Sequence, residues 1–153
     1  MALLSMFAKK ALLPETDKSM IVDAIRASEK KTSGEVRVYI ESRCRFVNSL
    51  DRASEIFYSL QMDKTEFRNA VLVYAAIKDH QLAVFADEGI YEKAGAGFWN
   101  TAVKGMLLHF NANDYGKGIS QVVTEIGNTL QANFPYDSST DKNELPDDIV
   151  FGK

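Results

Sequence analysis

The spacing of apolar residues changes several times along the first half of the chain. Residues 14–33 have apolar side chains at helical spacing, and Pro14 followed by two acidic residues is typical of a helix start. Residues 34–42 alternate between apolar and polar, as in a half-buried strand. Residues 49–62 return to the helical period, and we expect Ser49 to cap that helix.

A run of apolar residues then marks the centre of the predicted sheet. Residues 70–77 read AVLVYAAI, which suits a strand covered on both faces. The turn KDHQ leads into a further strand, LAVFAD, at residues 82–87. The second half is helical, with one amphipathic helix expected over residues 91–110 and a last one over residues 119–134.

This order of elements favours a three-layer α/β/α sandwich with a central, mostly parallel sheet. The first two strands are joined through a helix and should be parallel, whereas the short turn between the second and third predicts an antiparallel hairpin. We expect one domain over residues 14–135. Residues 1–13 would form an N-terminal extension, and residues 136–153 a polar, acidic tail over the surface.

Composition excludes several classes of protein. The 153 residues carry a net charge of −3, so nothing favours sequence-blind binding of nucleic acid. Cys44 is the only cysteine, which excludes a disulfide framework and a thiolate zinc site. The sequence shows neither a secretory signal nor an apolar stretch long enough to span a membrane. We therefore expect a cytoplasmic protein.

The predicted connections bring polar residues from three segments to one edge of the sheet. The starts of the first two strands and the end of the third meet there. This edge collects four candidate metal ligands, Glu35, Glu66, Asp87 and Glu88, and three candidate phosphate or charge partners, Lys64, Arg68 and Asn69. Carboxylates held together need a cation, and oxygen ligands suit Ca²⁺ or Mg²⁺ rather than zinc.

Structural roles also explain these residues. Asp87 or Glu88 can cap a helix that begins near Ile90, and Arg68 can pair with Asp87. Glu66 and Arg68 can also simply face solvent. The opposite edge is a rival site, because residues 41–45 and 79–80 bring two arginines, a cysteine and a histidine together there.

The same segments carry a family resemblance. The stretches SGEVRVYIES, RASEIFYSLQMDKTEFRNAVLVYAAI, FADEGI, FW, NANDYGKGI and NELPDDI occur in this order. Together they resemble the TPM domain family, in its stand-alone bacterial form, over residues 15–150. The most specific piece is the run M-x-K-T-E-x-R-N, at Met62, Lys64, Thr65, Glu66, Arg68 and Asn69.

The resemblance implies an α/β/α sandwich that binds a divalent cation, most often calcium. Plant relatives in the thylakoid lumen have been assigned acid phosphatase activity, and an animal relative is an auxiliary subunit of a receptor. We therefore predict a domain that binds Ca²⁺, or else Mg²⁺, with weak metal-dependent phosphatase activity on a phosphorylated small molecule. The alternative is a non-enzymatic module that contacts a protein partner through its acidic tail and an exposed aromatic residue.

Overall fold

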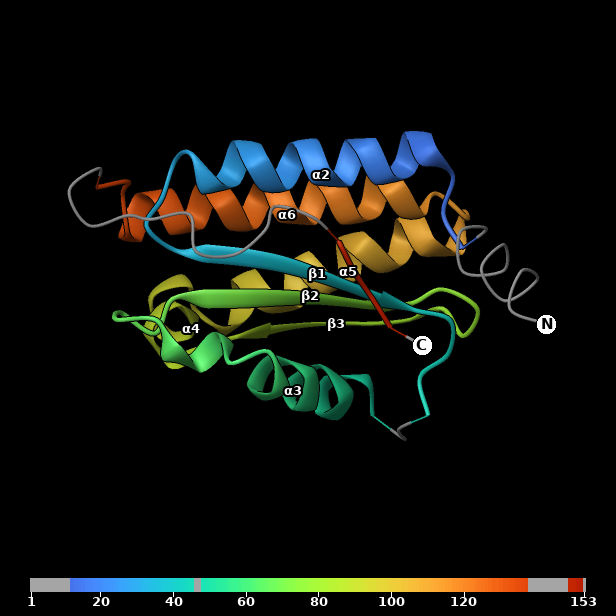
Figure 1. Ribbon diagram of the computed structural model, residues 1–153, viewed down its shortest axis with the longest axis horizontal. Helices are drawn as coiled ribbons and strands as arrows, with labels where there is room; N and C mark the ends of the chain where they lie inside the picture. Colours follow the sequence, from blue (N-terminus) through green and yellow to red (C-terminus); the bar gives the residue numbers. More distant parts are fainter. Residues whose placement is uncertain (1–11, 46–47, 138–148, 153) are drawn as a thin grey trace.

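The computed structural model describes residues 12–45, 48–137 and 149–152. Within these ranges the strands form one sheet in the order β3-β2-β1-β4 (Figure 1). The elements are α2 (Glu15–Glu29), β1 (Glu35–Glu41), α3 (Ser49–Ser59), η1 (Met62–Lys64), β2 (Ala70–Ala76), β3 (Gln81–Ala86), α4 (Glu88–Ala94), α5 (Ala96–Asn111), α6 (Tyr115–Asn133) and β4 (Val150–Phe151).

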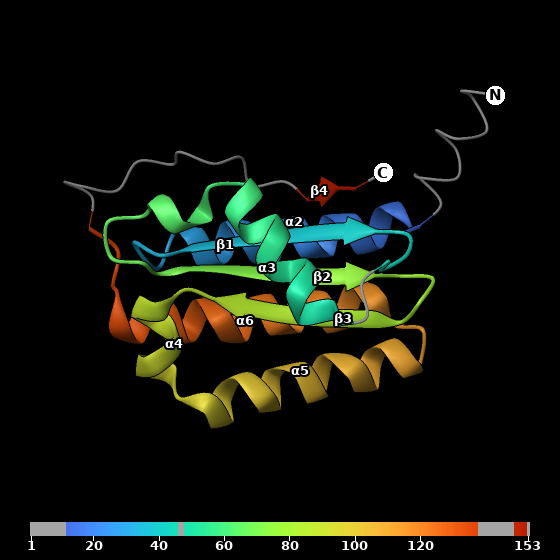
Figure 2. The same ribbon diagram turned by 90° about the horizontal axis from the view of Figure 1, so that it is seen from below.

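The predicted α/β sandwich and its strand directions are confirmed. Strand β1 pairs with β2 in parallel, and β2 pairs with β3 in antiparallel. Helices α2, α5 and α6 cover one face of the sheet, and α3 covers the other (Figures 1 and 2). Every residue of β2 is buried, as the continuous apolar run predicts for a strand that contributes to two cores.

Two hydrophobic cores lie on the two faces of the sheet. Alternate residues Val36, Val38 and Ile40 of β1 face the core under α2, α5 and α6. The second core lies under α3 and includes Phe57 and Tyr74. Among the residues that the structure describes, none of the helices is both long and apolar enough to cross a membrane.

The structure differs from the sequence-based expectation at three places. The helix expected over residues 91–110 is two helices, α4 and α5, because Gly95 adopts a left-handed φ of 86° between them. Asn48, not Ser49, caps α3, and the Ser49 hydroxyl instead donates to Leu82 O. The sequence pattern also missed β4, which pairs in parallel with β1.

Candidate functional site

Backbone hydrogen bonds join the three predicted segments at one edge of the sheet. The N–H of Glu35 donates to Asn69 O at 3.3 Å, and the N–H of Gly89 donates to Arg68 O at 2.9 Å. The N–H of Asp87 donates to Ala70 O at 3.0 Å. The expectation that these three segments are neighbours is therefore confirmed.

The loop between η1 and β2 has a tightly constrained shape. Arg68 has a φ of 51°, a left-handed conformation that costs a non-glycine residue free energy. The Thr65 hydroxyl accepts from the Asn69 N–H at 3.2 Å and holds the turn. Gly89 packs directly on the loop, since a Cβ there would lie 2.1 Å from Phe67 O. Only glycine permits this close approach.

The turn places Arg68 against Asp87 in a bidentate ion pair. Arg68 Nε lies 2.7 Å from Asp87 Oδ2, and Arg68 Nη2 lies 2.9 Å from Asp87 Oδ1. Asp87 also caps α4 by accepting from the Glu88 N–H, and its side chain is only 3% exposed. The hydrogen bonds that Arg68 donates to Asp87 raise the pKa of Arg68, and the negative charges of Asp87, Glu88 and Asp63 raise it further. Both structural roles expected of Asp87 are confirmed.

The other candidate residues spread around this pair. Glu88 lies 3.5 Å from Arg68 Nη1 and is exposed. Lys64 is exposed and 3.9 Å from Asp63, and Glu66 is exposed on the neighbouring turn. The Asn69 side chain is 1% exposed, and its amide nitrogen has no hydrogen-bond partner.

Glu35 lies at the start of β1, two residues before Arg37. Burial lowers the pKa of Arg37, and the charges of Glu35 and Glu29 oppose that shift. The described residues contain no group of three or more His, Cys, Asp or Glu side chains placed to hold a metal ion. The four predicted carboxylates thus share one edge of the sheet without forming a closed set of ligands.

A hollow of about 450 Å³ opens beside this edge. Glu66 and Phe67 line it from the loop, and residues 133–137 line it from the end of α6. Lys93 lies over the Phe134 ring, 4.5 Å from its centroid. Glu66 therefore lines a concave surface that is partly aromatic, and it lies two residues before Arg68 in the loop.

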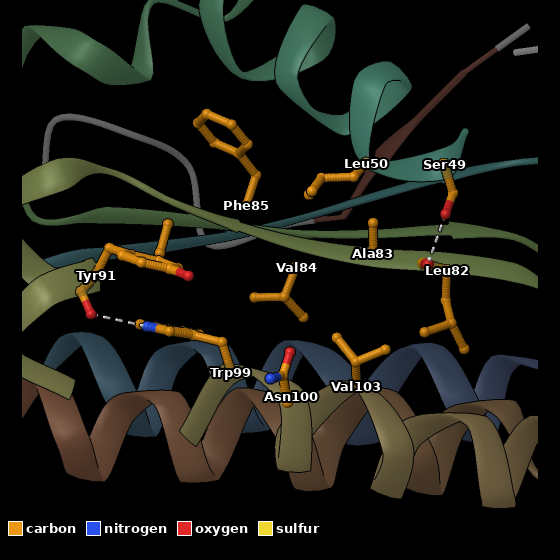
Figure 3. A pocket seen from close by; sticks show the side chains of 11 residues that line it. Ser49, Leu50, Leu82, Ala83, Val84, Phe85, Tyr91, Trp99, Asn100 and Val103 are labelled. Atoms are coloured by element: carbon orange, nitrogen blue, oxygen red, sulfur yellow. Dashed lines mark hydrogen bonds between the residues drawn. The ribbon is translucent and has the colours of Figure 1, made fainter. Parts of the chain in front are cut away.

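A second hollow, of about 470 Å³, lies between α3 and α5 along β3 (Figure 3). Trp99 is 5% exposed and forms part of the wall of this hollow. The Trp99 Nε1–H donates to Tyr91 O at 3.1 Å, and the two rings stack.

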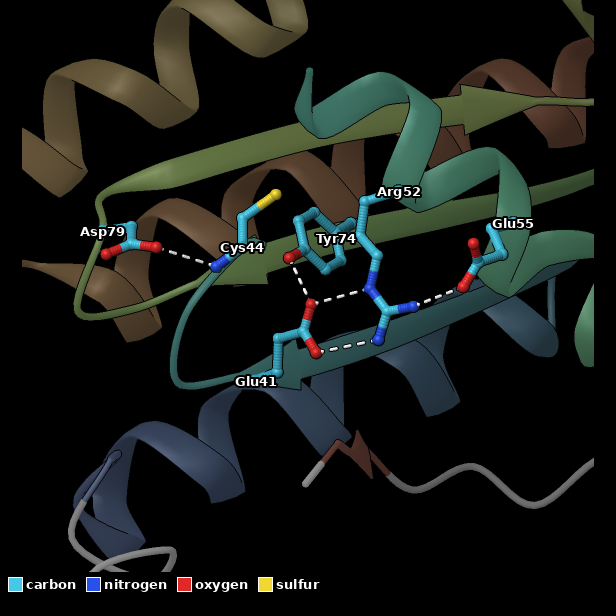
Figure 4. A network of polar contacts seen from close by, with 6 residues as sticks. All are labelled: Glu41, Cys44, Arg52, Glu55, Tyr74 and Asp79. Atoms are coloured by element: carbon cyan, nitrogen blue, oxygen red, sulfur yellow. Dashed lines mark hydrogen bonds and ion pairs between the residues drawn. The ribbon is translucent and has the colours of Figure 1, made fainter. Parts of the chain in front are cut away.

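The rival edge of the sheet holds a network of charged and polar groups (Figure 4). Arg52 donates to both carboxylate oxygens of Glu41 at 2.9 Å and to Glu55 at 2.7 Å. The buried Tyr74 hydroxyl also donates to Glu41. Burial and this hydrogen bond raise the pKa of Tyr74 well above its usual range. Glu41 thus has a cation and a hydroxyl as partners, which indicates a structural role.

Asp79 orders the loop after β1 at the same edge. It accepts from the Cys44 N–H at 2.8 Å and from Arg43 Nη1 at 3.0 Å. Asp79 therefore ties the end of the hairpin turn to the segment that leaves β1, a structural contact that the sequence pattern did not predict.

Arg37 is a residue that sequence reasoning missed. It is only 9% exposed, and its Nε has no hydrogen-bond partner. The signal was present in the alternation of β1, since an arginine flanked by buried valines must point at the opposite face of the sheet. That is the face of the sheet on which α3 lies (Figures 1 and 2).

Comparisons with known proteins agree with the resemblance seen in the sequence. The model of the TPM domain family matches residues 6–129. The NMR structure of BA42 from the psychrophilic bacterium Bizionia argentinensis has a TM-score of 0.81 at 35% identity, covering 92% of this chain and 95% of that one. The N-terminal domain of cg2496 from Corynebacterium glutamicum has a TM-score of 0.58 at 13% identity, covering 88% and 83%, and shows the fold alone. No curated protein matches significantly. The chain is therefore a member of the TPM domain family.

Proposed function

We propose that this TPM domain binds a divalent cation at the edge of the sheet around Arg68, with Ca²⁺ preferred over Mg²⁺. One observation carries the proposal: the single guanidinium of Arg68 lies 2.7 Å from Asp87 and 3.5 Å from Glu88, so two carboxylates share one cation. Glu66 adds an exposed carboxylate on the neighbouring turn. Such an excess favours a bound cation.

The candidate ligands divide into two groups by their present contacts. Glu66 and Glu88 are exposed and can turn toward an ion, whereas Asp87 is held by Arg68 and would position the loop. Glu35 begins β1 beside Ala70, the first residue of β2, and is the fourth candidate ligand. Ca²⁺ suits this arrangement better than Mg²⁺, because it accepts carbonyl and water oxygens in a flexible geometry.

Asn69 offers a further oxygen. Its amide nitrogen is buried without a partner, and a half-turn of the amide would put its carbonyl oxygen at that point. The amide could then accept a bond from an ion-bound water.

A melting experiment tests the proposal. Protein stripped with a chelator should melt at a higher temperature when Ca²⁺ is added. Ion at 100 times its Kd contributes about 2.7 kcal/mol of stability, or about 5–10 °C for a domain of this size. Mg²⁺ should act only at higher concentration. An unchanged melting curve in millimolar Ca²⁺ would contradict the proposal.

Matched charge variants locate the ion. Glu66→Gln and Glu88→Gln should each weaken the effect of Ca²⁺ on the melting temperature. Glu125→Gln removes one exposed carboxylate from α6 and should leave the effect unchanged. Equal responses in all three variants would show that the ion binds elsewhere.

The weak phosphatase activity is a second part of the proposal. A bound cation would supply electrostatic stabilisation of a phosphoryl group. Lys64 is the phosphate partner that remains accessible, because Asp87 occupies the fork of Arg68. The assay is hydrolysis of p-nitrophenyl phosphate. Activity that stops in chelator, falls in Lys64→Met and is unchanged in Lys104→Met would support this part of the proposal. Hydrolysis that persists in chelator and in Lys64→Met would point to a contaminant.

The predicted cytoplasmic location belongs to the same proposal. Cell fractionation followed by immunoblotting tests it, and recovery of the protein in an envelope or secreted fraction would contradict it.

A further inference from the structure

The outer edge of β3 leads to an inference about a different surface. Strand β3 lies at one end of the sheet and pairs only with β2 among the described strands. The Asp87 N–H donates to Ala70 O, which makes residues 87 and 70 a hydrogen-bonded pair. In the same register, Phe85 and Ala83 of β3 lie opposite Leu72 and Tyr74 of β2. Odd-numbered residues of β3 therefore bond to β2, and Leu82, Val84 and Ala86 direct their N–H and C=O groups away from the sheet.

One of these outward groups already has a partner. Leu82 O accepts from the Ser49 hydroxyl at 2.9 Å, which confirms its direction. Among the described residues, no hydrogen bond reaches the outward groups of Val84 or Ala86. Val84 and Ala86 both line a hollow, so these backbone groups lie in a recess and not on an open edge. Unpaired backbone groups in such a place favour pairing with another strand.

The recess is the hollow of about 470 Å³ along β3, which we call the β3 groove (Figure 3). Leu50 from α3 forms one wall, and Trp99 and Val103 from α5 form the other. Among the described residues that line the groove, none is charged; they are Ser49, Leu50, Leu82, Ala83, Val84, Phe85, Ala86, Tyr91, Trp99, Asn100 and Val103.

The wall residues suit an apolar occupant. Leu50 is 47% exposed and Tyr91 is 44% exposed, so both present apolar surface to solvent. The hydrogen bond from Trp99 to Tyr91 O fixes the indole in place. The groove thus combines a rigid apolar wall with a floor of free hydrogen-bonding groups.

We propose that the β3 groove binds an extended, uncharged peptide segment of another protein as an added strand beside β3. The free outward groups of Val84 and Ala86 lie about 7 Å apart, so an extended peptide of three or four residues can reach both. Alternate side chains of the peptide would face Leu50 on one side and Trp99 on the other. Backbone pairing would supply affinity and the two walls would supply selectivity, as in other β-augmentation complexes.

The shape of the groove favours a peptide over a second copy of this chain. Strand β3 runs between the walls formed by α3 and α5 (Figure 3). Two copies that approach through β3 would bring their walls into contact before their strands could pair. A single extended segment passes between the walls.

Amide exchange on the ¹⁵N-labelled full chain tests the proposal. The probe is a capped hexapeptide in which valine and threonine alternate. At a peptide concentration of about 1 mM, even a binding free energy near −4 kcal/mol gives detectable occupancy. The peptide should slow exchange of the Val84 and Ala86 amide protons. The same hexapeptide with every backbone nitrogen methylated should not. Absence of protection, or equal protection by the methylated peptide, would overturn the proposal.

Matched variants separate the groove from non-specific contact. Leu50→Glu places a charge on an exposed part of the wall and should weaken peptide binding about tenfold. Leu108→Glu makes the same change at a side chain that is 72% exposed outside the groove, and it should leave binding unchanged. Equal weakening by both variants would overturn the proposal. Protection of Val84 that rises with protein concentration without peptide would assign the groove to a second copy instead.

Discussion

Gly89 is the residue on which the geometry of the candidate edge depends most directly. A Cβ at this position would lie 2.1 Å from Phe67 O and 2.6 Å from Arg68 O. Ordinary contact begins near 3.4 Å, so the first distance is about 1.3 Å short. Both clashing atoms are backbone carbonyl oxygens and cannot rotate away. Gly89→Ala must therefore push the loop and α4 apart.

The expected cost follows from those contacts. Overpacking of this kind costs about 1–3 kcal/mol, and loss of the hydrogen bond from the Gly89 N–H to Arg68 O adds about 1 kcal/mol. Gly89→Ala should lower the melting temperature by about 5–15 °C. It should also weaken Ca²⁺ binding, because the displaced loop carries Glu66 and Arg68.

Gly105→Ala is the matched control. Gly105 is exposed within α5, and a Cβ there would meet nothing within 4 Å. The change should stabilise the protein by about 0.5–1 kcal/mol, because alanine favours the helix. Calorimetry of both variants compares them directly. A Gly89→Ala protein as stable as the Gly105→Ala protein would refute the described packing of the loop on α4.

Two further predictions concern the network at the opposite edge. Tyr74→Phe removes a hydrogen bond to a buried carboxylate and should cost about 1.5–3 kcal/mol in urea unfolding. Because burial raises the pKa of Tyr74, the stability that its neutral hydroxyl contributes is fully present below about pH 10 and is lost progressively as the pH rises above that value. The Tyr74→Phe protein should therefore lose stability less steeply than the original protein above pH 10. Equal slopes of unfolding free energy against pH for the two proteins would contradict this. Arg52→Leu leaves Glu41 buried without its cation and should cost about 3–5 kcal/mol. Arg43→Leu breaks the exposed pair with Asp79 and should cost under about 1 kcal/mol. Equal losses of unfolding free energy in Arg52→Leu and Arg43→Leu would argue against the described network.

The sequence predicted the sheet well because its signals are local and strong. The apolar run of β2 and the four-residue turn before β3 are enough to derive the central strand and its hairpin. The break between α4 and α5 was missed because a glycine inside an amphipathic pattern does not reveal its φ. The short β4 was missed because two residues carry no readable period, and only pairing with β1 defines the strand.

The candidate site was predicted in its position but not in its contacts. Chain connections alone placed the loop, the start of β1 and the start of α4 together, and the backbone bonds confirm this. They could not show that Asp87 is fully engaged by Arg68, since that depends on the left-handed turn at Arg68. The NELPDDI segment, part of the predicted contact surface, occupies residues 143–149. Of these, residues 143–148 lie outside the part of the chain that the structure describes.

A Ca²⁺ titration followed by ¹⁵N–¹H spectra tests the central claim most directly. We expect the amide signals of Arg68, Asn69 and Gly89 to shift and saturate when Ca²⁺ is added to chelator-stripped protein. The signals of Cys44 at the opposite edge and Val84 in the β3 groove should stay in place. Absence of any saturable shift, or shifts centred on Cys44, would contradict the assignment of a cation to this edge.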